Sequence, residues 1–170
     1  ADQDEVFPAN YPYTSGMTRI LRENFANLCT ETKKLIPLTK DDLVVDIGSN
    51  DGTLLRNFHD SGHRVLGIEP TDVAKIANDK GILTLQKFFN EDTARRVKAS
   101  FGQATVITAA NCFAHIDRVH NVVYGVKDLL ADDGVFITES HYLMGLLSSN
   151  QYDTIYHEHV SYFTYEPLHH

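Results

Sequence analysis

The segment VVDIGSNDGTLL, residues 44–55, constrains the fold of this chain more than any other segment. It opens with a β-branched run, which is typical of a buried strand. Asp46 lies near the end of this run, Gly48 and Gly52 allow a tight turn close to a ligand, and Thr53 can begin a helix. A strand, a glycine turn and a helix start in this order predict a nucleotide-binding loop.

Strand and helix patterns alternate along most of the chain. Parallel neighbours need crossover connections, which are usually helical, so this alternation predicts a mostly parallel sheet. We therefore expect an α/β fold, a doubly wound sheet with helices on both faces, that binds its ligand at the carboxyl ends of the strands. The expected strands are 43–47, 64–68, 82–85, 105–109 and 134–139, and the expected helices are 17–35, one starting at 53, 72–80, 91–101 and 117–130.

Length and composition predict one domain with a substantial core, because the chain has 170 residues, of which 42% are hydrophobic. Residues 1–16 are rich in Pro, Tyr and Asn and are expected to form an extended lead-in segment. Residues 17–150 are the predicted binding domain. The alternation fails after residue 140, and residues 151–170 are expected to form a tail rich in Tyr and His.

Charge and cysteine usage exclude several classes of function. The formal net charge of −8, without a cluster of Lys or Arg, argues against DNA or RNA as a partner. No apolar run approaches the roughly 20 residues that span a bilayer, and the first residues lack a signal sequence, so we expect a cytoplasmic protein with no membrane partner. Cys29 and Cys112 lack the spacing of a zinc site and are expected to be reduced and structural.

The glycine loop favours S-adenosylmethionine over a dinucleotide. A dinucleotide fingerprint needs a second glycine where this chain has Asn50. Instead, Asp46, Gly48 and Gly52 follow the spacing D-x-G-x-x-x-G, which resembles the first motif of class I S-adenosylmethionine-dependent methyltransferases. Glu69 follows the second strand, where a carboxylate can accept hydrogen bonds from both hydroxyls of a ribose. The simpler alternative is that Asp46 caps a helix and Glu69 is a solvated strand end.

Side chains after the third and fourth strands extend the predicted cofactor pocket. Phe88 and Phe89 could lie against an adenine, although two Phe at this spacing are as often core residues. Asn111 ends the fourth strand and could line the same pocket. The expected cofactor-binding residues are therefore Asp46, Gly48, Ser49, Asn50, Gly52, Glu69, Phe88, Phe89 and Asn111.

The tail holds four of the nine His and four of the eight Tyr of the chain, centred on IYHEHVSYF. Its periodicity fits a strand or a helix and leaves this choice open. Glu158 could orient His159 as a general base, with Tyr156 as a hydrogen-bond donor, because His titrates near neutrality. The pattern H-E-H lacks the H-E-x-x-H spacing of zinc sites, so no metal is expected. The alternative is a polar aromatic strand that packs on the sheet.

Four segments together, VVDIGSNDGTLL, GIEP, AANCFAHID and YHEHVSYF, are similar to the sugar C-methyltransferase family that acts on nucleotide-linked ketosugars. The resemblance covers nearly the whole chain and implies the Rossmann-like fold of class I methyltransferases. It implies that His159 is the catalytic base and that a tyrosine of the Y-P-Y segment, with Tyr13 preferred, reaches the substrate. The implied catalytic residues are His159, Glu158, Tyr156 and Tyr13, and the implied substrate-binding residues are Tyr11, His115 and His157.

The same resemblance implies a reaction. His159 would remove a proton from the carbon next to the ketone, and the resulting enolate would take the methyl group of S-adenosylmethionine, leaving S-adenosylhomocysteine. The partner would be a small-molecule nucleotide sugar, and the protein would be a monomer or a weak homodimer. The alternatives are an O- or N-methyltransferase of small molecules and, with less support from the loop, an NAD-binding oxidoreductase or epimerase domain.

Members of that family usually carry an N-terminal zinc module with four cysteines and a C-terminal domain that helps to hold the nucleotide sugar. This sequence shows neither of these parts. We therefore expect that the chain is the central methyltransferase domain, that residues 151–170 are cut short before a C-terminal domain, and that the isolated domain binds cofactor without turnover.

Overall fold

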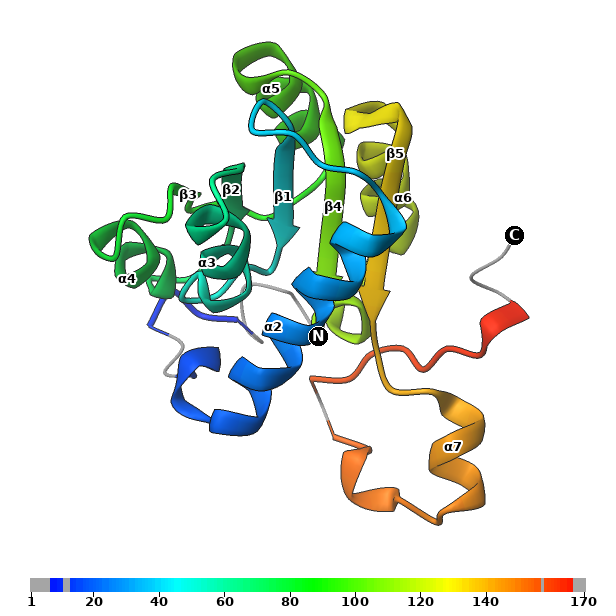
Figure 1. The fold of residues 1–170 in the computed structure, drawn as a ribbon. Coiled ribbons are helices and arrows are strands. Elements are labelled where there is room, and N and C mark those ends of the chain that lie inside the picture. The colour runs from blue at the N-terminus through cyan, green and yellow to red at the C-terminus, as the bar shows by residue number, and fades with distance from the viewer. Residues whose placement is uncertain (1–6, 11–12, 157, 167–170) are drawn as a thin grey trace.

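The computed structural model describes residues 7–10, 13–156 and 158–166. Within these residues, five parallel strands form one sheet in the order β3-β2-β1-β4-β5 (Figure 1). From β1 the chain first adds β2 and β3 on one side and then β4 and β5 on the other, so the strand order reverses beside β1. Sheets of this kind bind ligands at the point of reversal. The strands are β1 (Leu43–Ile47), β2 (Arg64–Ile68), β3 (Thr84–Leu85), β4 (Ala104–Ala110) and β5 (Leu130–Glu139).

Helices connect the strands, which confirms the predicted α/β class. The helix expected at 117–130 begins later, at Val119, and β5 begins at Leu130 directly after it. α7 was not predicted. Leu143, Leu146 and Leu147 follow helical spacing, but the segment has six residues, too few for a clear helical period, and it contains Gly145. No helix in the described part of the chain is long and apolar enough to cross a bilayer. The helices are η1 (Ser15–Met17), α2 (Arg19–Leu35), α3 (Thr53–Asp60), α4 (Val73–Asp79), α5 (Glu91–Phe101), η2 (Phe113–His115), α6 (Val119–Leu129), α7 (Leu143–Ser148) and η3 (Tyr152–Thr154).

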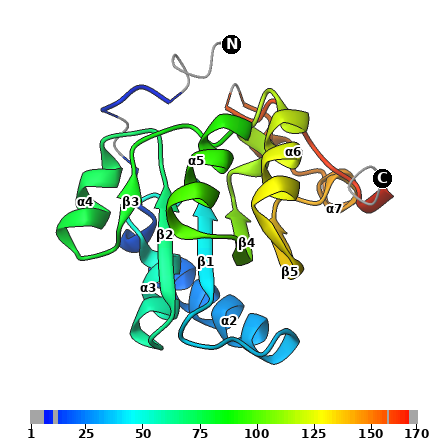
Figure 2. The ribbon, with the colours of Figure 1, turned by 90° about the horizontal axis from the view of Figure 1, so that it is seen from above.

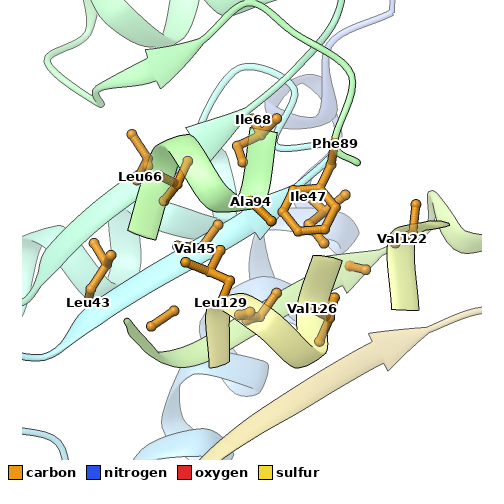
Figure 3. Close-up of a cluster of buried hydrophobic side chains, with 14 of the residues drawn as sticks. Leu43, Val45, Ile47, Leu66, Ile68, Phe89, Ala94, Val122, Val126 and Leu129 are labelled. Atoms are coloured by element: carbon orange, nitrogen blue, oxygen red, sulfur yellow. The ribbon is translucent and has the colours of Figure 1, made fainter. Parts of the chain in front are cut away.

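The strands send side chains into two apolar layers, one on each face of the sheet. Alternate residues of a strand point to opposite faces, so Val45 and Ile47 pack with α5 and α6, whereas Val44 packs with α2 and α3. Figures 1 and 2 show these helix pairs on opposite faces, and Figure 3 shows part of the first layer, including Phe89 and Val126. β1 is buried along its whole length, as a central strand covered on both faces must be.

Segments from both ends of the chain cover the carboxyl ends of the strands. The N-terminal segment leads into η1 and α2 at this edge, and the segment after η3 returns to it, as the blue and the orange to red ribbons show (Figure 1). The backbone amide of Asp72 donates to the carbonyl of Ala9 at 2.6 Å, and the amides of Val160 and Ser161 both donate to the carbonyl of Ala114. The ligand-binding edge of the sheet is therefore enclosed by two segments that lie far apart in the sequence.

The tail is neither a continuous strand nor a helix in its described residues. After η3 it turns and runs extended, and a single bridge joins Phe163 to Tyr142, with Leu143 N donating to Phe163 O at 2.9 Å. The ring of Phe163 packs against Phe113, with the ring centroids 5.4 Å apart. The tail thus packs beside the sheet without adding a strand to it.

Candidate active site

A cavity of about 1310 Å³ lies at the carboxyl ends of the strands. The N-terminal segment and α2 form one wall, and the loops after the strands and the tail form the others. This volume suits a small-molecule ligand of nucleotide size or larger. The residues predicted from the sequence that line it are Tyr13, Gly48, Asn50, Glu69, Phe88, Phe89, Asn111, His115, Tyr156, Glu158 and His159.

The loop after β1 turns at Gly48, where the backbone has φ +69°, a conformation that favours glycine. Its amide donates to the carbonyl of Ile68 at 2.8 Å, which ties the loop to the end of β2. A Cβ at this position would lie 2.8 Å from the Cβ of Cys112. The loop backbone therefore packs closely on the segment after β4, and glycine is the residue that permits this approach.

Asn50 joins the N-terminal segment to this loop through two side-chain hydrogen bonds. Its Oδ1 accepts from Ser15 N at 2.8 Å, and its Nδ2 donates to Tyr13 O at 3.1 Å. Its own backbone is left-handed, with φ +49°, a conformation that Asn tolerates better than most residues. The amide of Asn50 is thus largely engaged by the protein, and its position places the Tyr13 segment over the cavity.

Glu69 lies at the end of β2, 5% exposed, with its carboxylate held from two sides. Oε2 accepts from Asn50 N at 3.0 Å, and Oε1 accepts from both Thr71 N at 3.0 Å and Thr71 Oγ1 at 2.7 Å. A carboxylate offers about four acceptor sites, so these bonds leave Oε2 able to accept a further hydrogen bond. A nucleoside hydroxyl in the cavity would find this acceptor already oriented.

Asp46 does not line the cavity; it is buried within β1 beneath it. Thr108 Oγ1 donates to Asp46 Oδ1 at 2.6 Å. Burial raises the pKa of Asp46 to about 7, the bond from Thr108 opposes this rise, and the negative charge of Glu69 adds to it. Asp46 was predicted to contact the cofactor. In this structure its carboxylate instead joins β1 to the neighbouring strand β4 through the bond from Thr108.

Ser49 and Gly52 also lie outside the cavity lining and shape the loop. Ser49 is 3% exposed, and its Oγ has no hydrogen-bond partner among the described residues. Gly52 has φ +76°, and a Cβ there would lie 3.0 Å from the side chain of Ile82. These two residues let the turn and the start of α3 pack tightly on the apolar layer that contains Ile82.

The sequence left open whether Phe88 and Phe89 line the cofactor pocket or belong to the core, and the structure places one in each environment. Phe89 is 8% exposed and belongs to the core layer under α5 and α6, where Gly125 leaves room for its ring. Phe88 is half-buried and lines the cavity. Asn111 follows β4 with a left-handed backbone, φ +56°, and its Nδ2 donates to Glu139 Oε1 at 3.0 Å.

Tyr156 and His159 form a hydrogen-bonded pair on the tail side of the cavity. Tyr156 Oη lies 3.1 Å from His159 Nε2, and His159 Nδ1 lies 2.9 Å from the carbonyl of Thr154. A carbonyl only accepts, so Nδ1 carries the ring proton and Nε2 presents its lone pair to the hydroxyl. Burial raises the pKa of Tyr156, helped by the charge of Glu158, so its hydroxyl remains a donor.

A group of imidazoles surrounds this pair. The ring of His159 lies 4.8 Å from that of His115 and 5.3 Å from that of His141. Burial lowers the pKa of His159, and the proximity of the other two imidazoles lowers it further, while the carbonyl of Thr154 and the charge of Glu158 oppose the shift. His159 is therefore a neutral imidazole near neutral pH, which is the form a general base requires.

His115 connects this group to the tail. Its Nδ1 lies 2.7 Å from the carbonyl of Glu158, and its ring makes an edge contact with Phe7. Among the described residues, no group of three or more His, Cys, Asp or Glu is arranged to hold a metal ion. Two residues of the predicted site, Tyr11 and His157, lie outside the described residues.

Sequence reasoning missed several residues of the cavity. Arg118 is the single Lys or Arg side chain in the described lining, and His141 and Ser140 follow β5 at the same edge. Asn24 of α2 also lines the cavity, and it donates to Glu139 at the end of β5. The available signal was that Glu139 ends the fifth strand and His141 follows it, because all parallel strands end at one edge.

These features define the class of the protein. A parallel sheet of this order, a glycine turn after β1 and a carboxylate at the end of β2 form the fold and nucleoside site of class I methyltransferases. The donor set fits S-adenosylmethionine: Gly48 keeps the loop free of a side chain, and Glu69 presents an acceptor to a ribose. The described lining offers a single cation, which is little for the diphosphate of a dinucleotide.

The chain belongs to the methyltransferase domain family, whose model matches residues 20–170. C-methyltransferase NovU of Streptomyces niveus is 38% identical over 163 residues, which is 95% of this chain. The chain spans 39% of the length of that relative. The match thus covers a part of NovU and nearly all of this domain.

Solved structures share the fold at low sequence identity. A SAM-dependent methyltransferase from Archaeoglobus fulgidus superposes with a TM-score of 0.67 at 17% identity, covering 88% of this chain and 69% of that chain. A SAM-dependent methyltransferase from Anabaena variabilis superposes with a TM-score of 0.65 at 17% identity, covering 98% and 75%. The plantazolicin methyltransferase BpumL, solved with SAH, superposes with a TM-score of 0.66 at 12% identity, covering 91% and 63%. These likenesses confirm the class I fold.

Proposed function

We propose that the protein containing this chain is an S-adenosylmethionine-dependent C-methyltransferase that acts on the carbon next to the ketone of a nucleotide-linked deoxy-ketosugar. The observation that carries this proposal is the pairing of Tyr156 with a neutral His159 in the same cavity as Gly48 and Glu69. The 38% identity to a protein named a C-methyltransferase supports methylation at carbon.

The cofactor would lie along the loop after β1. Glu69 would accept from a ribose hydroxyl, Gly48 would let the nucleoside approach the backbone, and Phe88 would flank the adenine. Bound there, S-adenosylmethionine would supply an electrophilic methyl group on a positively charged sulfur. The acidic character of the lining, with Glu69, Asp117 and Glu158, suits a cationic ligand.

His159 would act as the general base. Its Nε2 lone pair, held by the Nδ1 bond to Thr154, would take the proton from the carbon next to the ketone, and the electron pair left on carbon would form the new bond to the methyl group. A positioned base contributes about 10²- to 10⁴-fold to such a step. Much of the remaining acceleration would come from holding carbon and methyl in contact.

Tyr156 would stabilise the enolate oxygen. Its hydroxyl donates to His159 in the ligand-free arrangement, and a substrate would have to take over that contact at Nε2. The hydroxyl would then be available to the ketone oxygen, where negative charge develops. Tyr13, which is 48% exposed and lines the same cavity, is a second candidate donor.

Arg118 would contact the nucleotide part of the substrate. It precedes α6 at the cavity wall, is exposed, and makes no ion pair with any described residue. A guanidinium suits a diphosphate because it donates two parallel hydrogen bonds.

The free cysteines Cys29 and Cys112 fit the reducing environment of a cytoplasmic enzyme.

The test separates proton removal from methyl transfer. The full-length protein is incubated in deuterated water with nucleotide-linked ketosugars and S-adenosylhomocysteine, and hydrogen exchange at the carbon next to the ketone is followed by NMR. We expect exchange without cofactor turnover, and a C-methylated product when S-adenosylmethionine is supplied. In His159→Ala both should be lost, while S-adenosylhomocysteine still binds.

Other outcomes would point to the competing functions. Methylation at oxygen or nitrogen, without carbon exchange, would identify an O- or N-methyltransferase. Binding of NAD in preference to S-adenosylhomocysteine would identify an oxidoreductase or epimerase domain. Turnover that survives in His159→Ala would show that another group is the base.

A further inference from the structure

The base of the proposed reaction must lose a proton once in every turnover. His159 Nδ1 lies 2.9 Å from the carbonyl of Thr154, and Nε2 lies 3.1 Å from the hydroxyl of Tyr156. A proton taken from the substrate carbon arrives at Nε2, because Nδ1 already carries one. It must also leave from Nε2, since Nδ1 is bound to a backbone carbonyl. His159 is ready for a second turnover only after this proton has left.

The groups around His159 differ in how well they can accept this proton. A carboxylate is ordinarily a weaker base than an imidazole, with a pKa of about 4.3 against about 6.5, and a neutral phenol hydroxyl carries no second proton near neutral pH. Another imidazole matches the basicity of His159. The described residues that contact its ring or act on its charge are Thr154, Tyr156, Glu158, Tyr162, His115 and His141. The two other imidazoles are therefore the suitable acceptors.

These two imidazoles have different surroundings. The ring of His115 lies 4.8 Å from that of His159, but the residue is half-buried. Its Nδ1 lies 2.7 Å from the carbonyl of Glu158, and its ring makes an edge contact with Phe7. A proton passed to His115 would remain inside the cavity wall. The ring of His141 lies 5.3 Å from that of His159, and this residue is exposed.

His141 belongs both to the cavity and to the surface. It lies between the end of β5 and α7, where the chain leaves the sheet (Figure 1), and it lines the cavity. Its ring nitrogens make no hydrogen bond with any described residue. Exposed side chains change rotamer within picoseconds to nanoseconds. His141 can therefore turn between His159 and the surrounding water many times in one turnover, and one bridging water can complete the contact with the base.

Bound ligands would hinder a direct exit of the proton through the cavity. The substrate carbon must lie at Nε2 of His159, with S-adenosylmethionine beyond it, so ligands take the place of water next to the base. Ligands in such cavities bury most of their surface. A second imidazole that faces the base on one side and water on the other lets the proton leave before the products do.

We propose that His141 carries the proton of each turnover from His159 to solvent. This inference rests on the proposed function. The carbon-hydrogen bond of the substrate breaks, its electron pair forms the new bond to the methyl group, and sulfur keeps the electrons of the old bond. The proton passes to Nε2 of His159, then to a ring nitrogen of His141, and from there to water or to a buffer base. His141 acts through His159 and needs no contact with the substrate.

The test separates proton release from methyl transfer in the full-length protein at neutral pH. With S-adenosylhomocysteine bound, exchange of the hydrogen next to the ketone into deuterated water requires the proton to leave His159, because a proton that stays there returns to carbon. A single turnover of methyl transfer from S-adenosylmethionine does not require this. In His141→Gln the exchange rate should fall about 10-fold or more relative to the single-turnover rate. Added imidazole, a diffusible base, should restore exchange.

Two further variants complete the test. His141→Phe keeps a ring beside His159 but has no nitrogen to carry a proton, so it should behave like His141→Gln. His120→Gln is the matched control, because it removes an exposed imidazole of α6 that does not line the cavity, and it should change neither rate.

Three outcomes would overturn the inference. Equal loss of both rates in the His141 variants, or a loss of exchange that imidazole does not restore, would show a structural role. Unchanged exchange in either His141 variant would show that the proton leaves by another route or that only the ring is needed. If the unaltered protein neither exchanges the hydrogen nor methylates the sugar, the proposed function itself fails.

Discussion

The hydroxyl of Tyr156 and the Nε2 atom of His159 lie 3.1 Å apart, and the Nδ1 bond to Thr154 selects the tautomer that makes this contact. The backbone of the tail therefore sets which nitrogen can accept a proton. His159 also contacts Tyr162, whose hydroxyl donates to the same carbonyl of Thr154 at 2.9 Å. His159, the proposed base, is oriented by its own segment, and that segment packs on η2 at the wall of the cavity.

The first prediction concerns the pH dependence of turnover. Because burial and the neighbouring imidazoles lower the pKa of His159 from its ordinary value of 6.5, the neutral form persists to lower pH than for a free imidazole. We expect kcat/KM of the full-length protein to rise with pH through a midpoint below 6.5 and to be level near pH 7. A midpoint above 6.5 would contradict the assignment of His159 as the base.

Replacement of Tyr156 by Phe should separate its role from that of the base. Tyr156→Phe keeps the ring beside His159 but removes the hydroxyl that is the proposed donor to the enolate oxygen. We therefore expect kcat to fall about 10²-fold, as for loss of one oxyanion donor. The KM for substrate should change little. Tyr152→Phe, an exposed tyrosine outside the cavity lining, is the control and should keep full activity. Full activity in Tyr156→Phe would remove this residue from the mechanism.

Glu69 and Thr71 should act together on nucleoside affinity. Glu69→Gln replaces one carboxylate oxygen with a donor and should weaken S-adenosylhomocysteine about 10- to 100-fold, because bonds to charged groups contribute about 1.5–3 kcal/mol. Thr71→Val removes the 2.7 Å bond to Oε1 and should weaken it less, since the backbone bond remains. Calorimetric titration measures both. A larger loss in Thr71→Val than in Glu69→Gln would contradict direct contact by the carboxylate.

Asn50 should position Tyr13 rather than bind the cofactor directly. Asn50→Gly tolerates the left-handed backbone but removes the bonds to Ser15 and Tyr13. Amide exchange in residues 13–17 should become faster, kcat should fall several-fold, and the affinity for S-adenosylhomocysteine should change little. Hydrogen-exchange mass spectrometry measures the first of these effects. Unchanged exchange with a large loss of affinity would identify Asn50 as a cofactor ligand.

Much of the fold could be predicted from the sequence, because local patterns encode it. The β-branched run of β1 and the glycines after it led directly to the strand and the turn, with the observed bounds of Leu43–Ile47. Glu69 was found from its distance along the chain, since a parallel sheet brings the ends of β1 and β2 together. These inferences needed periodicity and topology alone.

The finer structure of the site could not be predicted, because it depends on tertiary packing. Asp46 follows the motif spacing, yet its strand position turns it toward Thr108. The periodicity of the tail did not reveal that it is held by the carbonyl of Ala114 in η2. Glu139 carried no local motif, and its hydrogen bonds to Asn24 and Asn111 form only because α2 and the segment after β4 meet it in space.

The last prediction concerns Asp46 and the stability of the ligand-free protein. Its folded pKa of about 7 lies above the unfolded value of 3.8, so between these values the folded state binds the additional proton. The contribution of Asp46 to the free energy of unfolding is therefore fully present below about pH 4 and is lost as pH rises through 7. Asp46→Asn keeps an acceptor for Thr108 and does not ionise, so this loss should disappear.

Urea unfolding at pH 5 and pH 8 measures the effect. At each pH we subtract the unfolding free energy of the unaltered protein from that of Asp46→Asn. This difference should be more favourable to the variant at pH 8 than at pH 5, by on the order of 2 kcal/mol. This shift is the readout, because the buried NH₂ group of Asn adds its own pH-independent cost. Asp132→Asn, at an exposed position in β5, should show no such shift. A shift of the opposite sign would mean that Asp46 is ionised and stabilised in the folded state, and that its carboxylate meets a positive charge within the fold.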